Sequence, residues 1–177
     1  IFGMPRRIRA YCAVGKYHNI DVEDDVTIFG EYENGATASF ITTTGDACGT
    51  NRLEITGDKG KIVIEHGKLC WWKLAVPERE FCFSAKEGFV TPDTTYEEFT
   101  APEPEGHPQV LEAFAQSILY GAPLIADGRE GLNSLSISNA AYLSAWTDGW
   151  VDIPSDETLF EKYLKELCDK EKISKKQ

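Results

Sequence analysis

The sequence has few of the features that mark membrane or nucleic-acid-binding proteins. No window approaches the roughly 18 apolar residues of a membrane span, and no internal repeat is visible. Positive charge is scarce, because 18 Lys and Arg stand against 29 Asp and Glu, for a net charge of −11. Phosphates would be repelled by such a surface. The composition therefore argues against nucleic acid or an anionic membrane as a partner.

Cysteine pairs and cofactor motifs are missing too. The five cysteines are an odd number and none forms a CxxC pair, so we expect reduced thiols in a cytoplasm rather than a disulfide framework. His18, His66 and His107 are too scattered to indicate a metal site. The chain contains no GxGxxG, GxxxxGKS/T, HExxH or GxSxG. It therefore carries no recognisable dinucleotide site or phosphate loop.

What is present fits an ordinary globular domain. The chain has 177 residues, of which 42% are hydrophobic, enough to bury a core without a metal or disulfide. The first two thirds resemble short strands and the last third helices, a segregation typical of α+β proteins. We therefore expect a single domain over 1–177, with an open, predominantly antiparallel β-sheet and helices packed on one face.

The clearest predicted element is a hairpin over residues 25–44. Asn34-Gly35 tolerates the positive φ of a two-residue type I′ loop. That loop would pair Phe29 with Phe40 and Ile28 with Ile41, so that both faces carry apolar side chains. Helices can cover one face. The other face would then need a second subunit, because an apolar sheet face left in water promotes aggregation.

A second hairpin is predicted over residues 52–65, continuing as a strand over 68–74. A turn at Gly57–Gly60 pairs Ile55 with Ile62, Leu53 with Ile64 and Arg52 with Glu65. Weaker strand candidates lie at 81–84 and 95–100. Three helices are expected to follow. The first begins at Pro108 and ends at Gly121, the second begins at Asp127, and the third is capped by Ser155.

The connection between the hairpins, residues 44–52, is the strongest site candidate. Loops on a rigid scaffold often carry function, and the donors here suit polyol oxygens or a carboxylate; they are Thr44, Thr50, Asn51 and Arg52. The alternative is a glycine-rich turn in which Arg52 pairs with Glu65.

The turn over residues 18–25 leaves two further alternatives open. His18 forms a solvated pair with Asp21, Glu23 or Asp24, or it belongs to the site. The acidic residues Asp21, Glu23, Asp24 and Asp25 lack the spacing of a calcium loop, so a solvated turn is favoured. The alternative is that Asp24 or Asp25 holds the strand start through side-chain to backbone hydrogen bonds.

Several segments, in their order and spacing, resemble the C-terminal domain of the Gfo/Idh/MocA oxidoreductases over about Pro5 to Leu167. They are residues 22–26 (VEDDV), 33–36 (ENGA), 49–61 (GTNRLEITGDKGK), 127–132 (DGREGL), 139–146 (NAAYLSAW) and 153–154 (IP). The resemblance implies an N-terminal Rossmann domain that binds NAD or NADP. It also implies a C-terminal antiparallel sheet that contacts the substrate and, through its free face, other subunits. Such enzymes oxidise or reduce sugars, inositols and related polyols by hydride transfer.

The chain departs from that family in one large respect. The Rossmann glycines and the family's Lys-Pro motif are absent, and the sequence starts Ile1-Phe2-Gly3 without Met. We therefore expect the substrate-binding and oligomerisation domain of a longer cytoplasmic enzyme, inactive alone and without catalytic, cofactor or metal residues of its own. His18 does not match the family's active-site histidine. The alternative is a stand-alone, non-catalytic ligand-binding or assembly module.

Overall fold

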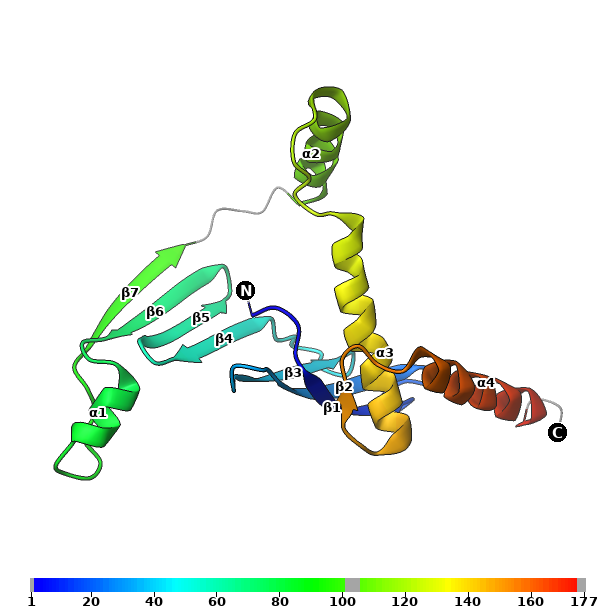
Figure 1. Ribbon diagram of the computed structural model, residues 1–177, viewed down its shortest axis with the longest axis horizontal. Helices are drawn as coiled ribbons and strands as arrows, with labels where there is room; N and C mark the ends of the chain where they lie inside the picture. The colour runs from blue at the N-terminus through cyan, green and yellow to red at the C-terminus, as the bar shows by residue number, and fades with distance from the viewer. Residues whose placement is uncertain (1, 101–105, 175–177) are drawn as a thin grey trace. The chain divides into compact units, whose positions relative to one another are not determined.

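The computed structural model describes residues 2–100 and 106–174, with side chains up to residue 170. The chain divides into two compact units (Figure 1). The first unit combines Ile1–Ala47 with Ala113–Gln177, and the second is Cys48–Glu112. The pairings between described strands are antiparallel. The α+β class is confirmed, with the strands divided between two four-stranded sheets.

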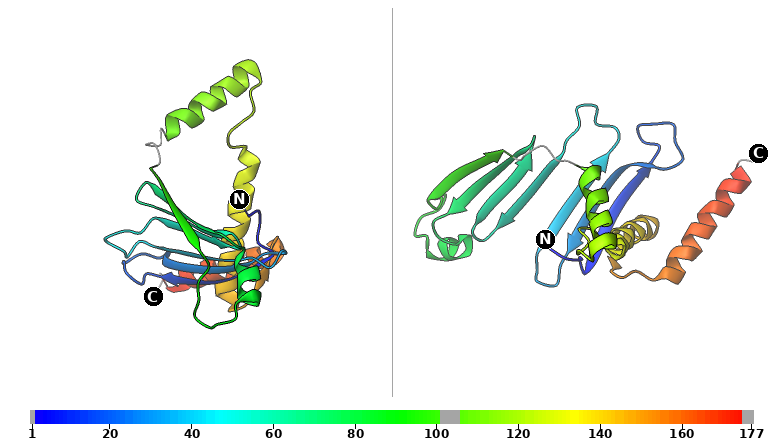
Figure 2. Two further views of the ribbon diagram at one scale, coloured as in Figure 1. Left: turned by 90° about the vertical axis from the view of Figure 1, so that its left-hand side faces the viewer. Right: turned by 90° about the horizontal axis from the view of Figure 1, so that it is seen from above.

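The sheet of the first unit has the strand order β3-β2-β1-β8. Its members are β1 (Arg7–Val14), β2 (Glu23–Glu31), β3 (Thr37–Thr43) and the short β8 (Val151–Asp152). Helix α3 (Gly131–Thr147) packs along one face of this sheet, as Figures 1 and 2 show.

The core of the first unit lies between β1 and α3. Side chains alternate along β1, because Ile8 is 1% exposed while Arg7 and Arg9 point to the other face and form ion pairs. Small side chains on α3 allow the helix to approach the sheet closely. The buried cluster consists of Ile8, Ala140, Ala141, Leu143 and Val151.

The first hairpin forms where the sequence predicts it, but the predicted register is wrong. β2 and β3 pair Ile28 with Phe40 and Thr27 with Ile41, instead of Phe29 with Phe40 and Ile28 with Ile41. Ile28 and Phe40 therefore share the face toward α3, whereas Phe29 and Ile41 share the opposite face. Apolar side chains still occupy both faces of the hairpin.

The turn explains the shifted register. The Tyr32 N–H donates to the Ala36 carbonyl, and the Gly35 N–H donates to the Tyr32 carbonyl. Gly35 has a φ of 83°, in the left-handed region. This is a three-residue loop, a turn followed by one left-handed residue, rather than a two-residue type I′ loop. The extra loop residue displaces every pair by one position.

The second unit contains a meander of four strands in the order β4-β5-β6-β7. They are β4 (Arg52–Gly57), β5 (Gly60–Glu65), β6 (Lys68–Leu74) and β7 (Thr94–Thr100). The register predicted for the second hairpin is confirmed. The observed pairs include Ile55 with Ile62, Leu53 with Ile64 and Arg52 with Glu65.

The strand predicted over residues 81–84 is wrong, because these residues form the end of helix α1 (Glu78–Ser84). The helix start is held by Asp58, from the turn between β4 and β5. The Asp58 carbonyl accepts from the Glu78 N–H at 2.7 Å, and its Oδ1 accepts from the Arg79 N–H at 2.9 Å. Because this partner lies about twenty residues upstream, the local sequence gives no signal for the helix.

The three helices predicted after residue 107 lie close to their expected boundaries. Helix α2 (His107–Tyr120) contains the boundary between the two units and ends at Gly121, which has a φ of 69°. Asp127 caps a short 3₁₀ turn, η1 (Gly128–Glu130), directly before α3. Helix α4 (Glu157–Ser174) is capped by the next residue after the predicted Ser155. There, Asp156 Oδ1 accepts from the N–H groups of Thr158 and Leu159.

Candidate functional site

The loop between β1 and β2 is built around one buried carboxylate. Asp24 is 2% exposed. Its Oδ1 accepts from the N–H of Lys16 at 2.9 Å, and its Oδ2 accepts from those of Tyr17 and His18 at 2.7 and 2.9 Å. Burial opposes ionisation, but the three backbone hydrogen bonds outweigh it and lower the pKa of Asp24 from 3.8 to about 2. The solvated turn favoured from the sequence is therefore wrong for Asp24, and the alternative, a carboxylate that holds the strand start, is confirmed.

Two of the predicted site residues meet beside this carboxylate. His18 Nδ1 lies 3.3 Å from Asp24 Oδ2 and 3.3 Å from Thr44 Oγ1. Thr44 is held in turn, because its N–H donates to the Asp24 carbonyl at 3.0 Å. The His18 side chain is 46% exposed. The ring is therefore fixed on one side and accessible on the other.

A second contact joins the same two segments. A Cβ on Gly45 would lie 2.3 Å from Tyr17 Cδ2, so the tyrosine ring occupies the space that a side chain at residue 45 would need. We call Tyr17, His18, Asp24, Thr44 and Gly45 the Asp24 cluster. It presents an imidazole, a hydroxyl and an aromatic ring from two loops that hold each other in place.

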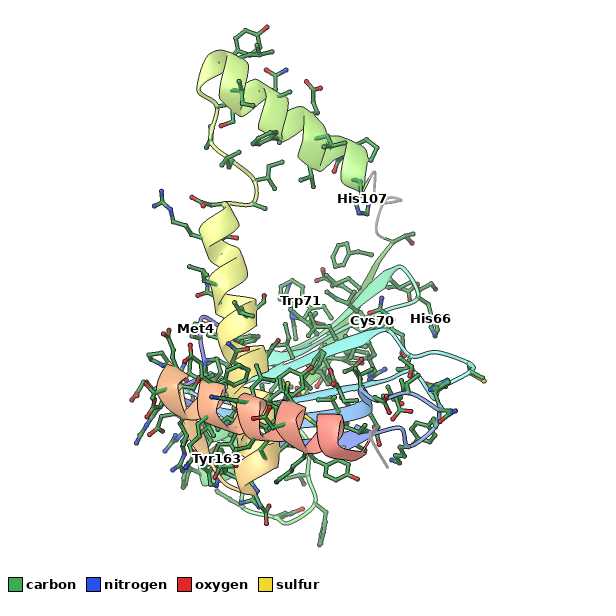
Figure 3. The ribbon with its side chains drawn as sticks, turned by 90° about the vertical axis from the view of Figure 1, so that its right-hand side faces the viewer. Met4, His66, Cys70, Trp71, His107 and Tyr163 are labelled. Atoms are coloured by element: carbon green, nitrogen blue, oxygen red, sulfur yellow. The ribbon has the colours of Figure 1, made fainter. Side chains whose placement is uncertain are left out.

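The other predicted residues lie in the second unit. Thr50 and Asn51 line a concavity of about 520 Å³ together with His66. His66 has a φ of 51° in the turn between β5 and β6 (Figure 3). His66 was not among the site residues predicted from the sequence. The predicted pairing of Arg52 with Glu65 could have identified His66, because the same register places Asn51 opposite His66.

Arg52 is engaged by two carboxylates. Its guanidinium donates to Glu65 at 2.7 Å and to Glu54 at 2.6 Å. The alternative interpretation, an Arg52–Glu65 pair, is therefore confirmed as a contact. Strand alternation puts Arg52 on the opposite face of β4 from Leu53, which lines the concavity. A role for Arg52 in substrate binding stays a prediction, as it does for the other four residues.

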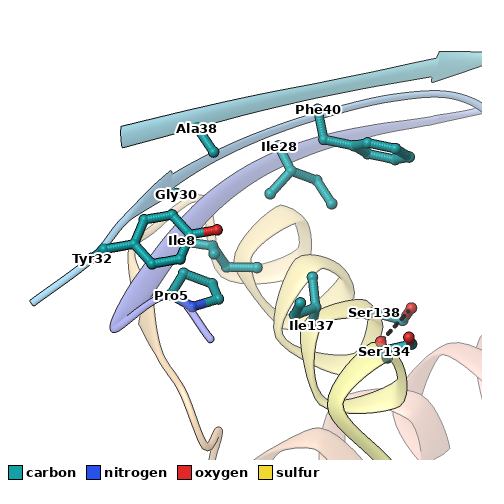
Figure 4. Close-up of a pocket in the computed structure, with 10 residues that line it drawn as sticks. All are labelled: Pro5, Ile8, Ile28, Gly30, Tyr32, Ala38, Phe40, Ser134, Ile137 and Ser138. Atoms are coloured by element: carbon teal, nitrogen blue, oxygen red, sulfur yellow. Dashed lines mark hydrogen bonds between the residues drawn. The ribbon is translucent and has the colours of Figure 1, made fainter. Parts of the chain in front are cut away.

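A separate groove of about 370 Å³ runs between the β2–β3 hairpin and α3. Ile28 and Phe40 point from the strands toward Ile137 on the helix, and Ser134 and Ser138 line the helix side (Figure 4). Its lining is mainly apolar, so it offers packing surface rather than reactive groups.

A smaller hollow of about 170 Å³ shares residues with this groove and is lined by Cys12, Glu23 and Tyr142. The Tyr142 hydroxyl donates to Glu23. Burial and the Glu23 charge together raise the pKa of Tyr142 to about 12. The phenol therefore keeps its proton at neutral pH and acts as a hydrogen-bond donor.

The described residues do not fit a nicotinamide dinucleotide. Such cofactors are held by a parallel βαβ unit with a glycine-rich turn, whereas both sheets here are antiparallel and the chain lacks GxGxxG. Across residues 2–100 and 106–174, no group of three or more His, Cys, Asp and Glu is placed to hold a metal ion. No helix in those ranges has the length and apolarity needed to cross a bilayer.

Comparison with known families gives a match over most of the chain. The family described as the oxidoreductase family, C-terminal alpha/beta domain, matches residues 1–153. Levoglucosan dehydrogenase from Pseudarthrobacter phenanthrenivorans is 28% identical over 149 residues, which are 76% of this chain and 37% of that enzyme. The chain thus spans less than two fifths of the length of this relative.

Solved structures show the same fold. The WlbA dehydrogenase from Chromobacterium violaceum, in complex with NADH and UDP-GlcNAcA, matches with a TM-score of 0.61 and 26% identity, covering 87% of this chain and 41% of that one. Levoglucosan dehydrogenase in complex with NADH and L-sorbose matches with a TM-score of 0.61 and 19% identity. That match covers 87% of this chain and 46% of the other.

Proposed function

Because the chain belongs to the Gfo/Idh/MocA oxidoreductase family, as its C-terminal alpha/beta domain, we propose that it is the substrate-binding part of a longer NAD(P)-dependent dehydrogenase acting on a sugar, inositol or related polyol. The observation that carries this proposal is the family match over residues 1–153. The identity to a levoglucosan dehydrogenase supports the substrate class. The cofactor would bind to a part of the protein outside this chain and supply hydride transfer.

The role of this chain would be to bind and orient the substrate. His18 and Thr44 supply an imidazole and a hydroxyl in the first unit, and Thr50 and Asn51 supply a hydroxyl and an amide in the second. These groups can form hydrogen bonds with the hydroxyl groups of a polyol. Arg52 is assigned to the same role with least support, because two glutamates already engage it.

The test is an activity assay on the full-length protein. NAD⁺ and NADP⁺ are each offered with a panel of sugars, anhydrosugars, inositols and sugar nucleotides, and reduced nicotinamide is followed by absorbance. Turnover of at least one polyol is expected. Residues 1–177 alone should show none, because hydride transfer needs a positioned nicotinamide. A full-length protein that turns over no member of the panel would favour the non-catalytic module instead.

Asn51→Ala tests the predicted substrate side directly. In the full-length enzyme it should raise KM or lower kcat and leave the melting temperature nearly unchanged, because the amide would act on substrate. Asn133→Ala is the matched control, an exposed asparagine on α3. Wild-type kinetics with a lowered melting temperature would show that the loop is structural.

We further propose that the face of the first sheet opposite α3 forms a contact between copies of the protein. Ile41 is 70% exposed and Tyr11 60% exposed on this face. Phe29 packs edge-on against Trp150, at 5.9 Å between ring centroids. A homo-oligomer would cover this apolar area.

Sedimentation of the full-length protein at about 10 μM, a concentration at which an oligomer with a micromolar Kd is populated, should detect the oligomer. Ile41→Glu should shift the protein toward the monomer. A strictly monomeric wild type would contradict the proposal.

A cytoplasmic location is part of the same proposal. Cys12, Cys70, Cys82 and Cys168 are thiols rather than disulfides in the structure, and thiols persist in a reducing compartment. Fractionation of the producing cells should place the full-length protein with cytoplasmic markers; recovery from an oxidising compartment would contradict this.

A further inference from the structure

We infer that Asp24 is a positioning residue, which fixes the Nδ1–H tautomer of His18 so that the imidazole presents Nε2 as a hydrogen-bond acceptor to a hydroxyl group of the substrate. The ligand in this inference rests on the proposed function. The relation between Asp24 and His18 rests on the contacts of the Asp24 cluster alone.

The tautomer follows from what each partner can do. An ionised carboxylate only accepts hydrogen bonds, and Asp24 Oδ2 lies 3.3 Å from His18 Nδ1. A neutral ring must therefore carry its proton on Nδ1 to make this contact, since the other tautomer would direct a lone pair at the carboxylate. Thr44 Oγ1 contacts the same nitrogen at 3.3 Å and can accept from it as well. The carboxylate contact therefore leaves Nε2 as the acceptor, and the Thr44 contact is compatible with this tautomer.

The ring is also held in place through its backbone. The same carboxylate accepts from the N–H groups of Lys16, Tyr17 and His18, so three consecutive residues are fixed by one side chain. The Asp24 carbonyl accepts from the Thr44 N–H at 3.0 Å. A ligand that meets His18 therefore meets a group already ordered, which lowers the entropy lost on binding.

The charges around the ring select the kind of ligand. Asp24 carries its negative charge beside His18, and Lys16, the nearest described cation on this loop, is paired with Asp25. An anionic group would be repelled by the negative charge of Asp24. A hydroxyl group, in contrast, can donate to Nε2. The cluster therefore favours a neutral polyol over a sugar acid.

The first experiment measures the tautomer without using activity. Full-length protein labelled with ¹⁵N-histidine is studied by NMR in alkaline buffer, where imidazoles are ordinarily neutral. The His18 nitrogens should show the pattern of Nδ1–H, and Asp24→Asn should shift the ring toward Nε2–H. A wild-type His18 that carries its proton on Nε2 overturns the inference, and this result does not depend on whether Asp24→Asn folds.

The second experiment is a double-mutant cycle in the full-length enzyme with its polyol substrate. His18→Ala should raise KM by up to about tenfold, the effect of one lost hydrogen bond, and His18→Gln should restore part of it. Asp24→Asn should also raise KM, but it should add nothing in the His18→Ala background. His107→Ala is the matched control, at the exposed start of α2.

The outcomes separate this inference from the proposed function. An equal KM increase from Asp24→Asn with and without His18 would show that Asp24 is merely structural and overturn the inference. Unchanged KM in His18→Ala would overturn it as well, while the dehydrogenase assignment would stand. If the wild type turns over no polyol, the proposed function fails and takes with it the ligand assigned to Nε2; the NMR result still decides the role of Asp24.

Discussion

Different interactions stabilise each of the two units of the chain. In the first, α3 covers one face of the sheet and buries Ile8 and Leu143 to within 2% exposure. In the second, Val63 is the one hydrophobic side chain that is buried, among the residues that the structure describes. Its sheet instead carries cross-strand ion pairs, such as Lys68 with Glu98 at 2.7 Å.

The difference shows where the stability of the protein resides. Exposed ion pairs contribute little to the free energy of unfolding, and a sheet without a covered apolar face is marginal. On the other face of the second sheet, Leu53, Ile64 and Phe99 remain between 38% and 49% exposed. The second unit therefore has little hydrophobic stabilisation of its own, whereas the first has its own core.

The largest contrast is expected from a matched pair of Leu→Ala substitutions. Leu143→Ala removes a buried side chain and should lower the free energy of unfolding by about 3 kcal/mol. Leu53→Ala, at a site 45% exposed, should cost less than about 1 kcal/mol. Urea unfolding of the full-length protein followed by circular dichroism measures both. Equal losses would mean that the apolar face of the second sheet is covered in the assembled protein.

A smaller loss is expected at the polar centre of the first unit. Ser144 is fully buried; its hydroxyl accepts from the Ala10 N–H at 2.8 Å and donates to the Gly149 carbonyl. Ser144→Ala leaves two partly buried backbone groups without this partner and should cost about 2 kcal/mol. Ser136→Ala is the control, because that hydroxyl bonds only within its own exposed helix turn. A stability change no larger than the control's would contradict the role of Ser144.

The two units should also respond differently to acid and salt. Asp24 has a pKa of about 2 in the folded protein, below its ordinary 3.8, so its contribution to stability is complete above about pH 4 and is lost as the pH falls toward 2. Asp24→Asn should remove that part of the acid dependence.

Glu98 has its pKa lowered by Lys68 and Tyr96. These contacts are exposed, so salt weakens them. In a ¹³C NMR titration, added salt should raise the pKa of Glu98 and leave that of Asp24 nearly constant.

The smallest change in stability is expected at Arg52. Its ion pairs with Glu54 and Glu65 are exposed, so Arg52→Met should lower the melting temperature slightly, and high salt should erase the difference. A rise in KM of the full-length enzyme with unchanged stability would support substrate contact. A clear loss of stability that persists in high salt would contradict the weak role assigned to these pairs.

The sequence predicted the strands better than the details of their turns. The second hairpin was correct in register because its apolar and charged residues match only in one alignment, with Arg52 opposite Glu65. The first was displaced by one residue because Asn34-Gly35 fits a two-residue or a three-residue loop equally well. Helix α1 escaped prediction because its start is held by Asp58, from another turn.

The candidate site was predicted only in part for a similar reason. The meeting of His18 with Asp24 was one of three open pairings, and it is decided by three backbone hydrogen bonds that no local pattern specifies. The contact of Tyr17 with Gly45 depends on two loops far apart in sequence. His66 was accessible to prediction, since the confirmed register of β4 and β5 leads directly to it.

The hydrogen bond from the Ala10 N–H to Ser144 can form only late in the synthesis of the chain. It spans 134 residues, so on the order of ten seconds of translation separate its two partners. During that interval β1, β2 and β3 can pair, but their apolar face has no α3 to cover it. The second sheet, whose strands are neighbours in sequence, completes its pairing earlier. Until α3 is made, the nascent first unit therefore exposes an apolar sheet face, which promotes aggregation.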